Sequence, residues 1–393
     1  MFNVKARLWV KGRKRLMERI ESCRLGDKKI IWIHCSSLGE FEQGRPVIED
    51  VKKRRKDYEV LLTFFSPSGY EVRKNYPLAD YVYYLPLDSE SSAKRFIDHF
   101  KPDVAVFVKY EFWYFFIREL YSRNIPVYLV SAVFRPSQVF FRSWGGWFRN
   151  ILKMFTHLFV QNTASEKLLK DKGIERVTVC GDTRFDRVSA IASKSEEIPL
   201  ARAFSAGKNV LVAGSTWRAD EEMLVGYINN SDDETGFIIA PHETSAENIE
   251  RIEKRLKKPF ARFSHARKDT AKSYSVLIVD SVGMLSFLYK YGQVAYVGGG
   301  FGIGIHNILE AAVYGMPVIF GPSYGKFAEA VELARLGGAF PVNNSAELKS
   351  LLDKFFSDRT ALNKASEISR SFVQSGEGAT KIITDTIFPD SGT

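Results

Sequence analysis

The chain contains few cysteines, and their arrangement excludes a disulfide framework. The three cysteines, Cys23, Cys35 and Cys180, are odd in number and lie far apart in the sequence. Neither they nor the six histidines show the Cys-x-x-Cys or His-x-x-x-His spacing of common metal sites. The sequence therefore predicts no protein-bound metal, and it favours the reducing cytoplasm.

Long apolar runs and targeting signals are also lacking. The best candidate, residues 104–116, is interrupted by Lys109 and Glu111, so it falls short of the ~18 consecutive apolar residues of a spanning helix. No signal peptide or low-complexity tract is visible. The 393 residues, 45% of them hydrophobic and 26% charged, are typical of a soluble globular protein of two domains.

Acidic residues are scarce near the N-terminus, which carries much of the formal net charge of +10. Such an excess of positive charge suits nucleic acid, anionic lipid or an acidic small substrate. Eight basic residues alternate here with apolar ones: Lys5, Arg7, Lys11, Arg13, Lys14, Arg15, Arg19 and Arg24. The pattern predicts a basic amphipathic helix that either lies on an anionic membrane surface or packs on its own domain.

Short apolar runs alternate with helix-length segments along the rest of the chain. This alternation predicts parallel sheets covered by helices on both faces. Six strands are expected in the first half, at residues 30–34, 60–65, 81–85, 104–108, 127–130 and 158–160. Five are expected in the second half, at residues 210–213, 236–240, 276–279, 294–297 and 317–320.

The two series predict an α/β fold with two doubly wound domains in tandem. We expect an N-terminal domain at residues 1–188, a polar linker at 189–208 and a C-terminal domain at 209–393. The last helix is expected to pack back on the first domain. Ligands of such sheets bind beyond the carboxyl ends of the strands, so the two domains are expected to face a central cleft.

A glycine-rich stretch at residues 296–310 lies between a predicted strand and a predicted helix. Its glycines would let the backbone approach a phosphate, which the first amides of a helix starting near Ile305 would bind. Glu310, about a turn and a half inside that helix, would accept hydrogen bonds from a ribose. An ordinary tight turn is the alternative interpretation. The glycines are Gly298, Gly299, Gly300, Gly302 and Gly304.

Glu40 follows the first predicted strand at the start of a helix. In one interpretation, Ser37 and Glu40 form a capping box, in which the glutamate accepts a hydrogen bond from a backbone amide. In the other, Glu40 is a general base that takes a proton from an attacking hydroxyl at the edge of the cleft. The helix N-terminus would keep its carboxylate ionised.

Glu111 ends another strand of the first domain and is surrounded by aromatic residues. A charge in such surroundings needs a partner, which we expect to be Lys109 or an arginine, unless Glu111 serves an acceptor substrate. Further arginines could bind anionic groups of a substrate or lie on an ordinary surface: Arg45, Arg135, Arg142 and Arg149.

In the second domain, Gly214-Ser215-Thr216 and Ala240-Pro241-His242-Glu243 end two predicted strands. Small hydroxyl side chains there could cap a helix or hold a phosphate, and His242 could bond a nucleobase, a sugar or a phosphate. The chain lacks both a serine nucleophile elbow and a hydride-transfer fingerprint. Two tandem domains with these strand ends favour group transfer from a nucleotide-activated donor.

Taken together, these segments resemble the Kdo transferases, which move 3-deoxy-D-manno-octulosonic acid (Kdo) from CMP-Kdo to a lipid A precursor in Gram-negative bacteria. The resemblance covers most of the chain. Its ordered motifs are Lys-Ala-Arg-Leu-Trp (5–9), Ser-x-Gly-Glu (37–40), Glu-x-Trp (111–113), Gly-Asp-Thr-Arg-Phe-Asp (181–186), Gly-Ser-Thr (214–216), Ala-Pro-His-Glu (240–243) and Gly-Gly-Gly-Phe through His-Asn-x-Leu-Glu (298–310).

The resemblance implies a GT-B glycosyltransferase that inverts the sugar, needs no metal or other cofactor, and works at the cytoplasmic face of the inner membrane. Glu40 would be the catalytic base. The acceptor would meet Gly39, Arg45, Glu111 and Arg135. The donor CMP-Kdo would meet Gly214, Ser215, Thr216, Pro241, His242, Glu243, Gly299, Gly300, Gly302, Ile305, His306, Asn307 and Glu310.

The chain departs from the family pattern at its start and in the acceptor wall. Family members usually carry an apolar anchoring segment before Lys-Ala-Arg-Leu-Trp, and only four residues precede it here, so we expect an anchor-trimmed or a peripherally attached protein. Lys109 and Tyr114 replace residues that are often acidic and proline. Two alternatives stay open: another GT-B enzyme that uses a UDP-sugar, such as a transferase or an epimerase, and a basic module that binds membrane or nucleic acid.

Overall fold

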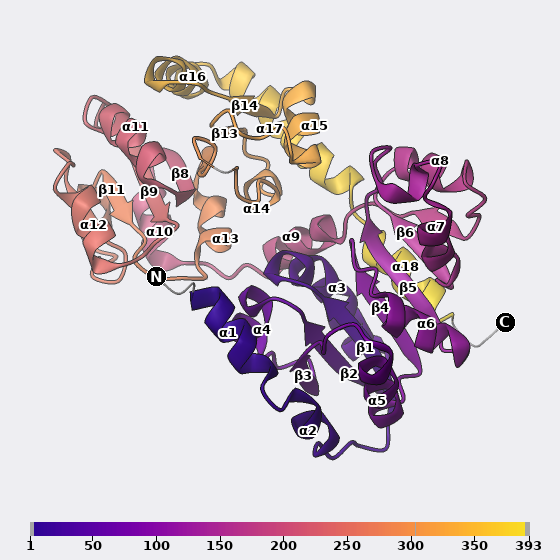
Figure 1. Ribbon diagram of the computed structural model, residues 1–393. Coiled ribbons are helices and arrows are strands. Elements are labelled where there is room, and N and C mark those ends of the chain that lie inside the picture. The colour runs from indigo at the N-terminus through magenta and orange to yellow at the C-terminus, as the bar shows by residue number, and fades with distance from the viewer. Residues whose placement is uncertain (1–3, 303, 390–393) are drawn as a thin grey trace. The chain divides into compact units, whose positions relative to one another are not determined.

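The computed structural model describes residues 4–302 and 304–389, and the chain divides into two compact units (Figure 1). Unit 1 comprises Met1–Asp186 and Gly376–Thr393, and unit 2 comprises Arg187–Ser375. Each unit is built on a seven-stranded sheet in which every strand pairing is parallel. The predicted α/β class with two doubly wound domains is therefore confirmed.

The sheet of unit 1 has the strand order β3-β2-β1-β4-β5-β6-β7. Its strands are β1 (Lys29–Cys35), β2 (Tyr58–Phe64), β3 (Tyr81–Tyr84), β4 (Val104–Val108), β5 (Val127–Ala132), β6 (His157–Val160) and β7 (Val177–Val179). The helices are α1 (Val4–Arg13), α2 (Leu16–Glu21), α3 (Leu38–Arg54), α4 (Pro67–Arg73), α5 (Glu90–Phe100), α6 (Tyr114–Ser122), η1 (Val139–Phe141), α7 (Gly146–Lys153), α8 (Thr163–Lys170) and α18 (Ala379–Ile387).

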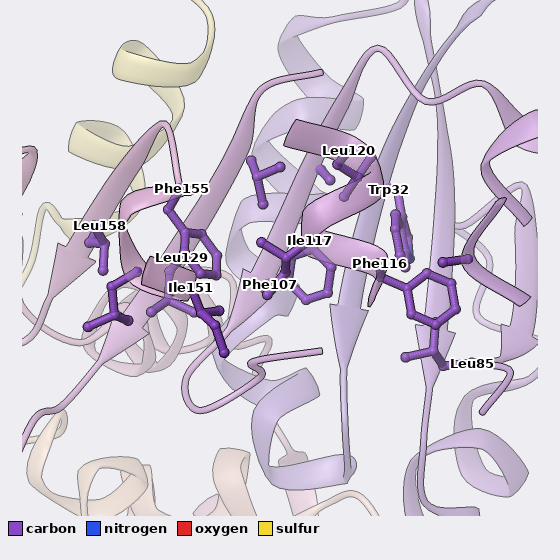
Figure 2. Close-up of a cluster of buried hydrophobic side chains, with 14 of the residues drawn as sticks. Trp32, Leu85, Phe107, Phe116, Ile117, Leu120, Leu129, Ile151, Phe155 and Leu158 are labelled. Carbon is purple, nitrogen blue, oxygen red and sulfur yellow. The ribbon is translucent and has the colours of Figure 1, made fainter. Parts of the chain in front are cut away.

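The two faces of this sheet bury two separate hydrophobic clusters. Successive residues of a strand point to opposite faces, so Trp32 belongs to one cluster, whereas Ile31 and Ile33 belong to the other. Figure 2 shows the first cluster, in which aromatic and aliphatic side chains such as Phe107 and Phe116 pack between the sheet and its helices. Burial on both faces explains why the strands are continuous apolar runs in the sequence.

The C-terminal segment completes unit 1. Helix α18 packs against α3, and the carboxylate of Asp186 accepts hydrogen bonds from the backbone amides of Gly378 (2.6 Å) and Thr380 (2.7 Å). A carboxylate at the positive end of a helix is a favourable arrangement. Gly376 packs so tightly on Phe185 that a Cβ there would lie 2.4 Å from the ring.

The sheet of unit 2 has the strand order β10-β11-β9-β8-β12-β13-β14. Its strands are β8 (Asn209–Thr216), β9 (Thr235–Pro241), β10 (Phe260–Arg262), β11 (Val276–Ile278), β12 (Val294–Val297), β13 (Val318–Phe320) and β14 (Ala339–Pro341). The helices are α10 (Pro199–Ser205), α11 (Arg218–Ile228), α12 (Ala246–Glu253), η2 (Ala271–Ser273), α13 (Leu285–Leu288), η3 (Tyr289–Tyr291), α14 (Leu309–Ala312), α15 (Ala328–Leu336), α16 (Ser345–Ser357) and α17 (Arg359–Ser375).

All eleven predicted strands are present, and three short strands were not predicted. The three are β7, β10 and β14, which lie at sheet edges and are three residues long. The predicted linker at residues 189–208 contains part of one helix and the whole of another. Helix α9 (Thr183–Ser193) runs across the boundary between the units, and α10 buries Ala201 and Phe204. Most of the small side chains in this stretch belong to helices, whereas Ser195, Ala206 and Gly207 lie outside them.

The basic N-terminal segment forms two helices instead of one. Helix α1 ends at Arg13, and Arg15 takes the left-handed conformation (φ 51°) before α2 begins. Helix α2 buries Leu16 and Ile20, whereas α1 buries no residue fully. Among the described helices, none is both long enough and apolar enough to cross a bilayer.

Candidate functional site

The carboxyl ends of β1 and β4, neighbours in the sheet of unit 1, bring polar residues together. Glu111 is only 8% exposed, and its Oε2 accepts hydrogen bonds from Trp113 Nε1 (2.6 Å) and His34 Nε2 (3.2 Å). The prediction that Lys109 or an arginine pairs with Glu111 is therefore wrong. Lys109 Nζ lies over the ring of Tyr110 instead. A buried histidine and an indole satisfy this carboxylate.

A chain of hydrogen bonds continues from Glu111 into the core. The hydroxyl of Thr63 lies 2.8 Å from His34 Nδ1, and Trp32 Nε1 donates to the same hydroxyl at 2.8 Å. A neutral His34 with its proton on Nε2 satisfies every member, because Thr63 can then donate to Nδ1 and accept from Trp32. The network fixes the position of the Glu111 carboxylate.

Glu40 lies in the first turn of α3, directly after β1. The hydroxyl of Ser37 donates to Glu40 Oε2, and no backbone amide donates to the Ser37 side chain. The predicted capping box is therefore wrong, because the serine binds the glutamate side chain instead of a backbone amide. The half-buried Glu40 faces one donor among the described residues, which leaves lone pairs available for a substrate proton.

The two carboxylates act on the same buried thiol. Burial raises the pKa of Cys35, and the negative charges of Glu40 and Glu111 raise it further. Cys35 ends β1, so this edge of the sheet holds two acidic groups and an unreactive thiol.

The other residues predicted to bind the acceptor substrate differ in their exposure and in their hydrogen-bond partners. Gly39 is exposed beside Glu40. Arg45 Nε donates to Glu49 at 2.6 Å, one turn along α3. Arg135 is exposed after β5, and its guanidinium has no partner among the described residues. Arg149 donates to the carbonyls of residues 140 and 142 and so has a structural role.

In unit 2 the glycine loop follows β12 at the carboxyl edge of the sheet. Gly299 has φ +94°, and its amide donates to the buried Asp220 at 2.9 Å. A Cβ on Gly298 would lie 2.3 Å from the carbonyl oxygen of Ser215, and one on Gly300 would lie 2.5 Å from the amide of Gly321. These two glycines are needed for close contact between chain segments.

The helix expected from Ile305 starts later. Helix α14 begins at Leu309, whose amide donates to Asn307 Oδ1 at 3.2 Å, and residues 304–307 are irregular. Among the described residues, the amides of Ile305, Asn307 and Ile308 have no acceptor. The loop therefore offers the free amide donors that the sequence predicted, although not from the first turn of a helix.

Glu310 lies in the first turn of α14 and not a turn and a half inside a helix. Its Oε1 accepts a hydrogen bond from Asn307 Nδ2 at 3.2 Å. Burial raises the pKa of Glu310, and Asn307 and the charge of Arg187 oppose that shift.

The last three residues of β8 have mixed roles. A Cβ on Gly214 would lie 2.1 Å from Tyr289 Oη, so this glycine is required for packing. Thr216 is buried and donates to Glu221 Oε1 at 3.2 Å, and Ser215 has φ 52°. The N-cap of α11 is Trp217, so of the two roles considered for Ser215 and Thr216, capping this helix is excluded.

Three rings gather at the ends of β8, β9 and β12. The indole of Trp217 stacks on the imidazole of His242 with 4.4 Å between centroids, and it donates from Nε1 to His306 Nε2 at 3.1 Å. Pro241 before His242 is buried, and Glu243 after it is exposed. The sequence analysis missed Trp217, although its position directly after Gly-Ser-Thr could have identified it.

Comparison with known proteins gives the family. A family model described as "3-Deoxy-D-manno-octulosonic-acid transferase (kdotransferase)" matches residues 13–187. The 3-deoxy-D-manno-octulosonic acid transferase of Aquifex aeolicus is 30% identical over 361 residues, which cover 90% of this chain and 92% of that protein. The chain belongs to the Kdo transferase family. The probable mitochondrial Kdo transferase of Arabidopsis thaliana is 27% identical over 88% of this chain and 81% of its own length.

Solved structures confirm the GT-B fold of this Kdo transferase family member. UDP-GlcNAc 2-epimerase from Neisseria meningitidis bound to UDP-GlcNAc superposes with a TM-score of 0.64 at 16% identity, over 92% of this chain and all of that one. At that identity the likeness concerns the fold alone. The family, and not this likeness, supports a glycosyltransferase of Kdo transfer in lipopolysaccharide biosynthesis.

Proposed function

We propose that this protein transfers Kdo from CMP-Kdo to a lipid A precursor with inversion at the anomeric carbon, with Glu40 as the general base. The observation that carries the proposal is the half-buried Glu40 carboxylate at the carboxyl end of β1, held by the Ser37 hydroxyl. The ends of neighbouring strands at a switch point are where doubly wound sheets bind ligands.

In the proposed step a hydroxyl of the acceptor attacks the anomeric carbon of Kdo while Glu40 accepts its proton. The bond from that carbon to the CMP phosphate breaks, and CMP leaves as the anion. A base in hydrogen-bond contact with the attacking hydroxyl typically accelerates such a step by about 10²–10⁴-fold.

The donor is assigned to unit 2. The free amides of Ile305, Asn307 and Ile308 support binding of the CMP phosphate, because backbone donors need no reorganisation as charge develops on the leaving group. Glu310 is placed at the ribose in this proposal. Ser215, His242, Glu243 and Gly302 complete the donor surface, whereas Gly214, Thr216, Pro241, Gly299 and Gly300 support it through packing.

The proposed reaction assigns no step to a metal ion or a cofactor. Among the described residues, no cluster of three or more His, Cys, Asp or Glu side chains has the geometry to hold a metal. Charge on the leaving phosphate is assigned to amides instead.

The acceptor and the membrane are assigned to unit 1. A cavity of about 1230 Å³ lies between α1, α2 and the start of α5, lined by apolar side chains and by basic ones that include Arg7, Lys11 and Lys14. These three side chains have no acidic partner among the described residues, and Val10 nearby is 64% exposed. Basic and apolar side chains together favour attachment to the anionic cytoplasmic face of the inner membrane, where Arg135 and Arg45 would meet the anionic acceptor.

The test is the mass of a lipid A precursor after incubation with the protein and freshly generated CMP-Kdo. The proposal predicts a gain of one or more Kdo units, none with Glu40→Ala, and inhibition by CMP stronger than by UDP. A folded protein that adds no Kdo in lipid vesicles, or one that UDP inhibits more strongly than CMP, would contradict it and favour a UDP-sugar enzyme.

A further inference from the structure

The rings of Trp217 and His306 form one flat surface. Their planes differ by only 13°, and the hydrogen bond from Trp217 Nε1 to His306 Nε2 joins them edge to edge. His242 stacks on Trp217, with 4.4 Å between centroids, and lies against His306 at 4.7 Å with its ring tilted by 31°. Two rings joined in this way expose a plate wider than a single indole.

The plate is held in place before any ligand binds. One buried carboxylate, Asp220, accepts from the amides of Trp217 (2.9 Å) and Gly299 (2.9 Å) and from the hydroxyl of Tyr296 (2.7 Å). It therefore ties the segment after β8 to the loop that carries His306. The amide of His242 donates to the carbonyl of Thr216 at 2.9 Å, which fixes the third ring on the same frame.

Packing alone does not account for Trp217. It is 38% exposed, and among the described residues the only rings that contact it are those of His242 and His306. It is not part of the hydrophobic cluster that contains Leu211, Ala213 and Phe237. A preorganised, exposed aromatic surface beside free amides is suited to stacking a nucleobase, and base stacking on a tryptophan is a strong contact.

We propose that the paired rings of Trp217 and His306 are the stacking surface for the donor's nucleobase, with His242 supporting the opposite face. This inference rests on the proposed function, because it assigns the pyrimidine of the nucleotide donor to unit 2. It adds Trp217 to the donor site. It also gives the ring of His306 a role, because His306 Nε2 accepts the hydrogen bond that holds the indole in place.

The composition of the chain permits a direct test. Trp217 is the sole tryptophan between residues 187 and 375, and the other five lie at positions 9, 32, 113, 144 and 147. The full-length protein labelled with 5-fluorotryptophan would show the resonance of each indole by ¹⁹F NMR. Trp217→Phe assigns the resonance of interest, and Trp144→Phe assigns a matched control, since Trp144 in unit 1 is also exposed (69%).

Titration with CMP is expected to shift the Trp217 resonance and leave the Trp144 resonance in place. Ribose 5-phosphate, which lacks a base, is expected to leave both in place. Calorimetry should show that Trp217→Ala weakens CMP binding by about 10-fold or more, from the usual strength of base–aromatic stacking, and that Trp217→Phe weakens it less.

The outcomes separate the inference from the function on which it rests. If CMP binds by calorimetry without moving the Trp217 resonance, or if Trp217→Ala weakens ribose 5-phosphate as much as CMP, the stacking surface is overturned and the donor assignment survives. If UMP shifts the resonance and CMP does not bind, the stacking surface is supported and the CMP-Kdo donor is overturned. If no nucleoside monophosphate binds, both are overturned.

Discussion

The two parallel sheets differ in strand order, because β11 lies between β9 and β10 in unit 2, but they share the arrangement of strands around the switch point and present different chemistry there. In unit 1 the strand β1 lies between β2 and β4, and in unit 2 the strand β8 lies between β9 and β12. The first edge carries the carboxylates of Glu40 and Glu111, whereas the second carries a glycine loop, free amides and the rings of Trp217 and His306.

The difference shows that the residues after each strand, and not the sheet itself, decide what an edge can do. Carboxylates suit proton transfer from an acceptor hydroxyl. Amides and rings suit an anionic nucleotide. We therefore assign base catalysis to unit 1 and donor binding to unit 2, and the predictions below test that division.

The largest expected effect is on the catalytic carboxylate. Glu40→Gln keeps the shape of the side chain but cannot accept the proton, so kcat for Kdo transfer should fall by about 10²–10⁴-fold. Initial rates with saturating donor measure this. Glu42→Gln, two residues along α3 and paired with Arg73, is the matched control and should keep kcat within about twofold.

The next effect concerns the stability of the unit 1 edge. Glu111→Ala removes the acceptor of His34 and Trp113, and the free energy of unfolding should fall by about 3 kcal/mol because a buried donor and a half-buried donor lose their partner. Urea unfolding followed by tryptophan fluorescence reports mainly on unit 1, which holds five of the six tryptophans. An unchanged unfolding midpoint would contradict the proposed network.

The corresponding change at the unit 2 edge concerns packing. Gly298→Ala places a methyl group 2.3 Å from a carbonyl oxygen and should destabilise unit 2 by about 1–3 kcal/mol. Gly302→Ala in the same loop is the control, because the added methyl group would lie 3.6 Å from the carbonyl oxygen of Gly299, at ordinary contact distance. Hydrogen exchange of peptides from β8 and β12 measures both. Equal protection in the two variants would show that the glycine loop is not constrained by packing.

The smallest expected effect is on how the free energy of unfolding depends on pH, to which histidines of both units contribute. Burial lowers the pKa of His99, His157 and His306. As the pH falls, these histidines therefore become protonated in the unfolded chain at a higher pH than in the folded chain. The free energy of unfolding should therefore fall as the pH falls from about 7 to about 5. His306→Asn should make this fall smaller. A steeper fall in the variant would mean that His306 is charged in the folded protein.

The strands were predictable because a parallel strand buried on both faces is a continuous apolar run, as in residues 104–108. The edge strand β10 was not, because its three residues are only half-buried. The late start of α14 depends on the loop before it, which Asp220 holds from a distant segment. The pairing of Trp217 with His306 spans 89 residues and depends on how β8 and β12 align, which local patterns do not reveal.

The division of labour between the two edges is tested most directly by measuring CMP affinity and Kdo transfer on the same preparation of Glu40→Gln. The account predicts that calorimetry gives a CMP affinity within about twofold of the unmodified protein, while the single-turnover rate of transfer falls by at least about 100-fold. A variant that transfers Kdo at the unmodified rate, or that loses CMP binding in proportion to its rate, would contradict the account.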